Sequence, residues 1–301
     1  MLSLNGISKS FKGKLVVDNV NLHINKNQIY GLVGSNGAGK TTIMKMISGL
    51  LKESSGEITL FGQTGKSLVL ARKSLGVLIE NPALDLDVTA FDNLEYYFYA
   101  FGKNPSKNDI GNLLELVNLH NIEDKKVGEF SLGMKQRLGI AIALINDAKL
   151  LLLDEPTNGL DPIGIIEIRK LILNIVKEKG MSVLISSHIL SELEQLADRF
   201  AFLHKGKIMS EISAEEMYSN LNPSLNIKIR NKPAFENILH EMGILDRSNY
   251  DIQNQLFSIP IGSVDINEFF RKIVYNKIDI IDIDIKKTNL ENYYINVIEG
   301  K

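Results

Sequence analysis

The chain contains no cysteine among its 301 residues. This absence excludes disulfide bonds, thiolate metal sites and cysteine catalysis, and it suits a reducing compartment. The chain has no excess of basic residues either: it contains 34 Lys and Arg residues and 36 Asp and Glu residues. The formal net charge of −2 therefore gives no support for a nucleic-acid partner.

Long apolar runs are also missing. No run approaches the roughly 20 apolar residues that a membrane span needs, and residues 1–6 lack the basic-then-apolar layout of a signal peptide. A role at a membrane would therefore require a partner that holds the chain there. The composition is that of an ordinary globular protein, 44% apolar and 23% charged, with enough length for a main domain and a smaller one.

Residues 34–41 read Gly-Ser-Asn-Gly-Ala-Gly-Lys-Thr and fit the phosphate-loop pattern G-x-x-x-x-G-K-[ST] without a mismatch. Residues 28–33 before it predict a short buried strand, and residues 42–49 after it have apolar side chains at helical spacing. The alternative is an ordinary glycine-rich turn before a helix. The strand and the helix in their proper places favour the phosphate loop.

The chemistry of this loop explains its residue types. Glycines let successive N–H groups curl around an anion, and the helix N-terminus adds unpaired donors and partial positive charge. Lys40 supplies a full charge for the outer phosphates, and the Thr41 hydroxyl can ligate Mg²⁺. The predicted nucleotide-binding residues here are Ser35, Asn36, Gly37, Ala38, Gly39, Lys40, Thr41 and Thr42.

A second signal is the run Leu150 to Leu153 followed by Asp154 and Glu155. Four consecutive apolar residues fit a strand buried on both faces, and carboxylates at its end would lie at the sheet edge where α/β proteins bind ligands. Asp154 is a candidate to hold Mg²⁺ through water, and Glu155 to polarise the water that attacks the γ-phosphate. The alternative is an acidic cap for the following helix.

The order of the elements predicts an α/β fold. Two strands, 2–7 and 16–24, precede the phosphate loop, and apolar spacing between Thr89 and Asn121 predicts an inserted helical subdomain at about 85–140. Strands and helices then alternate from Leu150 to His204, which argues for a mostly parallel sheet covered by helices. We place this main domain at residues 1–218.

Residues 222–301 predict a separate small α+β domain. Strand patterns at 225–229, 250–252, 256–261 and 278–285 alternate with helical patterns at 234–242 and 266–275, and a last helix is predicted at 289–298. The order is that of a β-α-β-β-α-β split unit of the ferredoxin-like kind. No motif in this part of the sequence indicates a chemical role.

The third signal is the run Phe130-Ser131-Leu132-Gly133-Met134-Lys135-Gln136-Arg137, which lies about twenty residues before the acidic strand end and opens a helix predicted at 136–144. Alone it would indicate only a serine cap. It is one of five motifs that follow one another along the chain; the others are the phosphate loop, Asp154-Glu155, Asn158 to Asp161 and Ser187-His188. Because of these motifs and their order, residues 1–215 resemble the ATP-binding subunit of ABC transporters. The resemblance implies a phosphate-loop NTPase (RecA-like) core with an N-terminal antiparallel β-subdomain.

The resemblance also implies roles for individual residues. Phe11 corresponds to an aromatic that stacks on adenine, with a core phenylalanine as the alternative, and Val16 would also contact the nucleotide. His188 matches a histidine that touches the γ-phosphate. Ser131 and Gly133 would close on the ATP of an opposing copy, with Asp161 at the same seam. Two such chains would hold two Mg-ATP between them and attach, on the cytoplasmic side of the membrane, to a separate multi-span permease.

Two departures from the family pattern stand out. Glu80 occupies a position where glutamine is usual; it can still ligate Mg²⁺ but brings negative charge near the phosphates, so we expect slower hydrolysis or altered coupling. Leu132 and Met134 replace Gly and Gln of the common L-S-G-G-Q motif. Both departures are similar to the bacitracin and lantibiotic self-protection branch, in which the ATPase drives export of an antimicrobial peptide.

Two other classes remain open at this point. The first is a soluble ABC ATPase that remodels nucleic-acid or ribosomal complexes, although such relatives usually carry two ATP domains in one chain or long coiled coils. The second is a phosphate-loop kinase or GTPase, which lacks a motif of the Ser131 type upstream of an Asp-Glu strand end.

Overall fold

The computed structural model describes residues 1–80, 82–120, 122, 124–220, 224–245, 248–251, 256–261, 265–286 and 290–299. It divides into two compact units, one formed by Met1–Ala214 with the residues from Val297 onward and one by Glu215–Asn296. The predicted start of the second domain, residue 222, lies outside the described residues. So do Asn121, Ile252 and Asn289, each an end of a predicted element.

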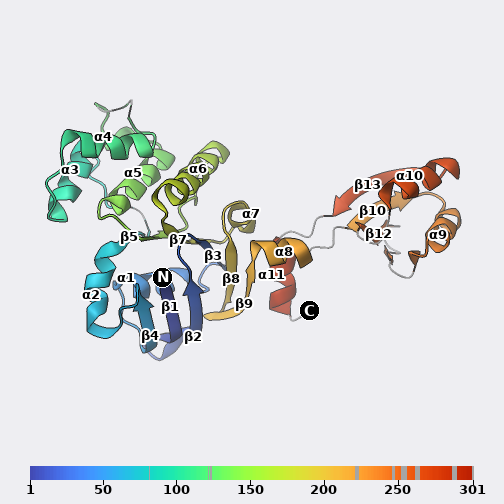
Figure 1. Cartoon of the computed structure of the whole chain (residues 1–301), viewed down its shortest axis with the longest axis horizontal. Helices are drawn as coiled ribbons and strands as arrows, with labels where there is room; N and C mark the ends of the chain where they lie inside the picture. The colour runs from blue at the N-terminus through green and yellow to red at the C-terminus, as the bar shows by residue number, and fades with distance from the viewer. Residues whose placement is uncertain are drawn as a thin grey trace. The chain divides into compact units, whose positions relative to one another are not determined.

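The first unit contains two sheets (Figure 1). A three-stranded antiparallel sheet has the order β2-β1-β4, with β1 at Leu2–Phe11, β2 at Lys14–Ile24 and β4 at Ser55–Leu60. A six-stranded sheet has the order β5-β6-β7-β3-β8-β9, in which β9 is antiparallel to β8 and the other pairs are parallel. Its bounds are β5 Leu75–Leu78, β6 Leu150–Asp154, β7 Ser182–Ser187, β3 Ile29–Val33, β8 Arg199–His204 and β9 Lys207–Ser213.

Helix α1, Lys40–Ser48, joins the two sheets into one core. It buries Ile43, Met44, Met46 and Ile47 in a cluster with apolar side chains of both sheets. On the larger sheet, Leu150 and Leu152 belong to this cluster, whereas Leu151 and Leu153 are equally buried outside it. The apolar run of β6 is therefore covered on both faces, as its sequence predicts.

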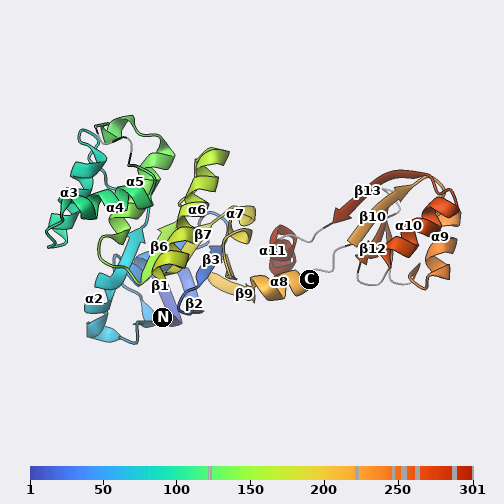
Figure 2. The same ribbon diagram turned by 45° about the horizontal axis from the view of Figure 1, so that its top comes forward.

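Helices α3 at Ala90–Ala100, α4 at Lys107–Leu116 and α5 at Leu132–Leu144 form the predicted helical subdomain. Figures 1 and 2 show these three helices grouped together beside the sheets. Capping boxes start α3 and α4, since Thr89 pairs with Asp92 and Ser106 with Asp109. Hydrogen bonds from Ser106 hold the pKa of the Asp109 carboxyl below its ordinary value.

The remaining helices of the first unit connect and cover the strands. They are α2 at Leu68–Ala71, α6 at Pro162–Lys179 and α7 at Leu190–Glu194. Short 3₁₀ turns lie at Gly65–Ser67, Arg72–Ser74 and Val127–Glu129. Helix α8, Ala214–Asn220, follows β9 and belongs to the second unit from Glu215 onward. In the described part of the chain, no helix is both long and apolar enough to span a membrane.

The second unit has the ferredoxin-like order that its sequence predicts. Its elements are β10 Ser224–Ile229, α9 Lys232–Glu241, β11 Asn249–Asp251, β12 Leu256–Pro260, α10 Ile266–Tyr275 and β13 Ile280–Lys286. The sheet order is β11-β12-β10-β13 and every pair is antiparallel. Helix α11, Leu290–Glu299, ends the described chain.

An aromatic cluster stabilises this second unit. The ring centroid of Phe235 lies 4.9 Å from that of Phe257 and 6.0 Å from that of Phe269, in edge-on arrangements. All three rings are fully buried and join a core that both helices and the sheet supply. The unit therefore has its own hydrophobic core, separate from the one around α1.

Candidate nucleotide and metal site

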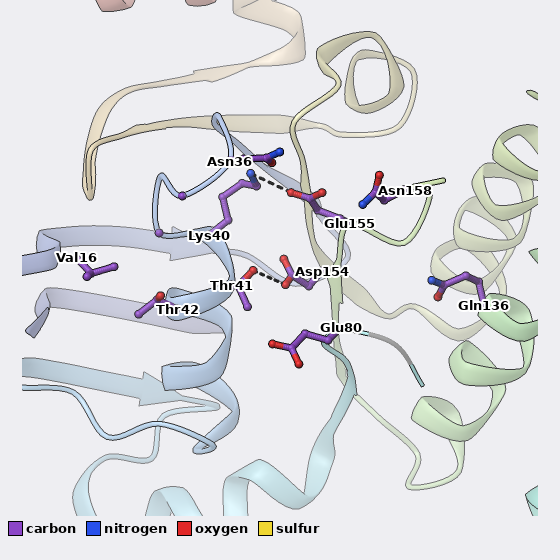
Figure 3. A pocket seen from close by; sticks show the side chains of 12 residues that line it. Val16, Asn36, Lys40, Thr41, Thr42, Glu80, Gln136, Asp154, Glu155 and Asn158 are labelled. Carbon is purple, nitrogen blue, oxygen red and sulfur yellow. Dashed lines mark hydrogen bonds and ion pairs between the residues drawn. The ribbon is translucent and has the colours of Figure 1, made fainter. Parts of the chain in front are cut away.

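Most of the residues predicted to bind nucleotide or metal line one pocket at the carboxyl ends of β3, β5 and β6 (Figure 3). This is the edge of a parallel sheet at which α/β proteins place their ligands. The pocket-lining residues are Val16, Asn36, Gly37, Gly39, Lys40, Thr41, Thr42, Glu80, Gln136, Asp154, Glu155 and Asn158.

The phosphate loop forms a tight cradle between β3 and α1. Gly39 has a φ of 113°, and a Cβ there would lie 3.2 Å from the carbonyl oxygen of Val16, so the position requires glycine. The side chain of Lys40 is only 4% exposed, and its Nζ donates to the carbonyl oxygens of Gly34 at 2.7 Å and Ser35 at 3.2 Å. Ser35 also accepts from the Ala38 amide at 3.1 Å. Ser35 and Ala38 thus shape the loop rather than line the pocket.

Asp154 is held between two hydroxyl groups. Its Oδ2 accepts from Thr41 Oγ1 at 2.6 Å, and its Oδ1 accepts from Ser186 Oγ at 2.6 Å. These contacts join the ends of β6 and β7 to the first turn of α1. Carboxylate and hydroxyl oxygens are the ligands that Mg²⁺ takes in proteins, so the donor set of Thr41 and Asp154 fits this metal.

Glu155 connects the cradle to the histidine that follows β7. Its Oε1 lies 3.1 Å from Lys40 Nζ, and its Oε2 lies 2.8 Å from His188 Nδ1. The backbone N–H of Glu155 donates to Ser186, both to the carbonyl oxygen at 3.2 Å and to the hydroxyl at 3.0 Å. Lys40 and His188 therefore hold the carboxylate, Ser186 holds the backbone of the same residue, and Glu155 lines the pocket.

Two neighbouring strands are each followed by an acidic residue whose backbone adopts the left-handed conformation. Glu80 follows β5 with a φ of 63°, and Glu155 follows β6 with a φ of 47°. Non-glycine residues seldom adopt this conformation, which costs on the order of 1–3 kcal/mol and concentrates at functional sites. The Glu80 carboxylate also forms an ion pair with Lys45 of α1, with an Nζ–Oε1 distance of 2.5 Å. Lys45 thus offsets the negative charge that Glu80 adds to the pocket.

Four predicted site residues lie away from this pocket. Phe11 is 44% exposed, so the alternative that it is a core phenylalanine is wrong, and Lys9 Nζ lies 5.2 Å from its ring centroid. Ser131 caps α5 by accepting from the Met134 amide at 3.2 Å. Asp161 caps α6 by accepting from the Gly164 amide at 3.0 Å. Ser131 and Asp161 are exposed, whereas Gly133 is partly buried in α5.

Sequence reasoning missed four residues of the site. Gln136 and Asn158 line the pocket, Ser186 holds Asp154, and Lys45 pairs with Glu80. Asn158 and Gln136 lie in quoted motifs, so their place could have been inferred. Ser186 is the last but one residue of β7, and Lys45 lies one turn beyond Thr41. Only the fold shows that their side chains reach the two carboxylates.

Residues 17–158 match the model of the ABC transporter family. The ABC transporter ATP-binding protein YcbN of Bacillus subtilis is 40% identical over 304 residues, covering 100% of this chain and 97% of YcbN. The chain belongs to the ATP-binding proteins of ABC transporters. It is accordingly a nucleotide-binding ATPase subunit of an ATP-driven transporter, and the two other classes considered from sequence are not favoured.

Two relatives carry more specific names. The bacitracin transport ATP-binding protein BcrA of Bacillus licheniformis is 38% identical over 98% of this chain and 96% of its own length. The lantibiotic transport ATP-binding protein SrtF of Streptococcus pyogenes is 46% identical over 73% of this chain and 96% of its own length. Similarity to BcrA therefore extends through the second unit, whereas the SrtF match covers a shorter part.

Solved structures agree with this assignment. A dimeric post-hydrolysis structure of the ATP-binding cassette MJ0796, bound to ADP and phosphate, has a TM-score of 0.64 and 25% identity, covering 71% of this chain and 99% of that one. CbiO1 of Clostridium perfringens, part of an ABC transporter complex, has a TM-score of 0.65 and 27% identity, covering 73% and 90%. The phosphate-loop α/β fold predicted from sequence is confirmed.

Proposed function

We propose that this chain drives export of an antimicrobial peptide, or a related compound, through a separate membrane permease. The observation that carries the proposal is the similarity to BcrA along both units of the chain, at 38% identity. Glu80, Leu132 and Met134 support it, since they are the departures from the common motifs that indicate the peptide-export branch.

In this proposal the pocket binds Mg-ATP. Lys40 and the loop amides hold the phosphates, Phe11 and Val16 contact the base, and Thr41, Asp154 and Glu80 serve the metal. Glu155 acts as the base toward the attacking water, and His188 contacts the γ-phosphate. The ion pair of Glu155 with Lys40 and its hydrogen bond with His188 support this assignment, because they place base, phosphate-binding cation and histidine within one connected group.

The working form in this proposal is a dimer. Two copies enclose two Mg-ATP, with Ser131, Gly133 and Asp161 of each copy facing the nucleotide of the other. The exposure of Ser131 and Asp161 supports this, because a surface cap keeps oxygen atoms and helix N-terminal amides available to a second molecule. ATP binding closes the dimer, and hydrolysis removes the γ-phosphate contacts and opens it.

The permease completes the proposed assembly. The chain would sit at the cytoplasmic face of the membrane, with the helical stretch from Glu80 to Ala100 receiving a cytoplasmic helix of the permease. Exposed aromatic side chains on and next to α3, Tyr96, Tyr99 and Phe101, support this surface. The C-terminal part, residues 222–301, is proposed as an accessory domain.

The test is antibiotic protection in a sensitive host that expresses the chain together with its membrane permease. We expect growth at bacitracin concentrations that stop the host, and loss of protection when Glu155 is changed to Gln. Nisin, a lantibiotic, and an antibiotic that is not a peptide serve as comparison compounds. Equal growth inhibition with and without the functional pair, for every peptide tried, would refute peptide export while leaving ATP hydrolysis intact.

A further inference from the structure

Gln136 lines the pocket, and the proposed ATPase chemistry gives it no role. It belongs to α5 of the helical subdomain, and its side chain is 6% exposed. Figure 3 shows its amide end directed from α5 toward the pocket that Glu80, Asp154 and Glu155 line from the opposite side. A neutral polar group thus enters the site from a different subdomain.

The Oε1 atom of Gln136 is buried, and no described residue donates a hydrogen bond to it. Asn93 of α3 provides the comparison, because it is a buried amide, 2% exposed, with its contacts satisfied. Asn93 Oδ1 accepts from the Asp85 amide at 2.9 Å, and its Nδ2 donates to the carbonyl oxygens of Asp85 at 2.9 Å and Thr89 at 3.0 Å. Asn93 therefore stabilises the fold, whereas Gln136 retains a free acceptor.

A buried acceptor without a donor costs about 1–3 kcal/mol. In the described structure, none of the pocket-lining side chains supplies that donor, although Asn36, Thr42 and Asn158 carry donor groups. Glu80, Asp154 and Glu155 can only accept when ionised, Thr41 already donates to Asp154, and Lys40 to two carbonyl groups as well as to Glu155. The Gln136 acceptor is therefore available to a donor that enters with a ligand, and water is the donor that accompanies phosphates and metal ions.

The position of Gln136 is fixed relative to Glu80. Gly139 lies one turn later on α5, and a Cβ at Gly139 would lie 2.8 Å from Cβ of Pro82. Helix α5 is therefore packed directly against the segment that follows Glu80. Because of this packing, we expect α5 to keep position 136 at the pocket wall when its side chain is replaced.

We propose that Oε1 of Gln136 accepts a hydrogen bond from a water molecule beside the bound phosphates, so that Gln136 is a positioning residue for ATP hydrolysis. The inference rests on the nucleotide pocket described above. An uncharged acceptor holds that water without adding negative charge next to the phosphates. It also makes the orientation of the water depend on the place of α5, the helix that Ser131 caps.

The test compares Gln136→Met, which keeps the volume of the side chain and removes the acceptor, with Asn93→Leu as the structural control. For Gln136→Met we expect kcat to fall about tenfold, the rate equivalent of one hydrogen bond, with KM for ATP within about twofold of wild type. Without nucleotide its Tm should rise by about 2–4 °C, because an unsatisfied buried group is gone. The further Tm increase produced by Mg²⁺ with a nonhydrolysable ATP analogue should be smaller than in wild type.

Asn93→Leu should behave in the opposite way, with a lower Tm and an unchanged kcat per folded molecule. An unchanged kcat in Gln136→Met would overturn the inference, as would a lower Tm or failure to fold, since either would mean that the amide is satisfied inside the protein. Gln136→Asn, which withdraws the acceptor by one methylene, should lose part of kcat. Failure of wild type to hydrolyse ATP would instead refute the pocket assignment itself.

Discussion

Lys40 and Glu155 are joined by an ion pair with an Nζ–Oε1 distance of 3.1 Å. Lys40 is proposed to bind the outer phosphates and Glu155 to activate water. In the ion pair, each of them neutralises the charge that the other brings to the pocket. In the proposed mechanism, a phosphate that binds Lys40 would replace the Glu155 carboxylate as its counter-ion. Phosphate binding would then free Glu155 to act as the base.

Glu155→Gln should separate ATP binding from hydrolysis. The amide keeps the shape of the side chain but cannot accept a proton, so phosphate release should fall by about 100-fold or more. Binding should persist, because Lys40 and the loop amides remain. We expect the purified variant to form a dimer with Mg-ATP, measured by light scattering after size exclusion. A variant that binds ATP and stays monomeric would contradict the proposed dimer.

The main fold was predictable because its signals are local. The apolar run before Asp154 and the glycine pattern at 34–41 fix strand, loop and helix without knowledge of distant contacts. The predicted helix boundaries were wrong where an N-cap residue sets the start. Helix α5 begins at Leu132 because Ser131 caps it, whereas the sequence predicted a start four residues later, at Gln136. The helical pattern from Thr89 onward splits into α3 and α4, since Ser106 starts a new helix.

What sequence reasoning missed depends on pairing in three dimensions. Strand β9, Lys207–Ser213, carries only one fully buried side chain, Ile212, and gains its structure by pairing with β8. The partners of Asp154 and Glu80 could not be deduced either, because Ser186 and Lys45 reach these carboxylates only through the order of strands and the direction of α1. Spacing along the chain carries no such information.

The ion pair of Lys45 and Glu80 should moderate the effect of the extra carboxylate on nucleotide binding. Lys45→Met leaves Glu80 uncompensated and should weaken Mg-ATP binding by about two- to fivefold, as expected for a partly exposed pair worth up to about 1 kcal/mol. The double variant with Glu80→Gln should restore the wild-type Kd. Titration of a fluorescent ATP analogue measures all four Kd values, and additive single effects would show that the pair is not coupled.

His188→Ala should reduce kcat more than it changes KM for ATP. His188 Nδ1 contacts Glu155 Oε2 at 2.8 Å, so its loss leaves the carboxylate oriented by Lys40 alone. We expect a fall in kcat of about 10²-fold. His23→Ala is the matched control, since His23 contacts only the surface partners Ser3 and Asn25 in the described part of the chain. Equal rates for the two variants would remove His188 from the proposed chemistry.

Phe235→Ala should unfold the second unit while the nucleotide pocket stays intact. The ring is fully buried between Phe257 and Phe269, so its removal should cost about 3–5 kcal/mol in a small core. The first unit has its own core around α1, and none of its pocket residues contributes to the Phe235 cluster. We expect a lower unfolding temperature for one of two calorimetric transitions, early proteolysis between β10 and β13, and an unchanged Kd for Mg-ATP.

Phe235→Ala tests the second unit more selectively than truncation does. Residues from Val297 onward group with the first unit, and a shortened chain would lose them. Tyr275→Ala, at an 86% exposed position of the same unit, is the control and should leave both transitions in place. A drop in ATP affinity in Phe235→Ala alone would mean that the stability of the second unit and nucleotide binding are thermodynamically linked. That result would contradict independent units and make the C-terminal domain a regulator of the ATPase, since linkage acts equally in both directions.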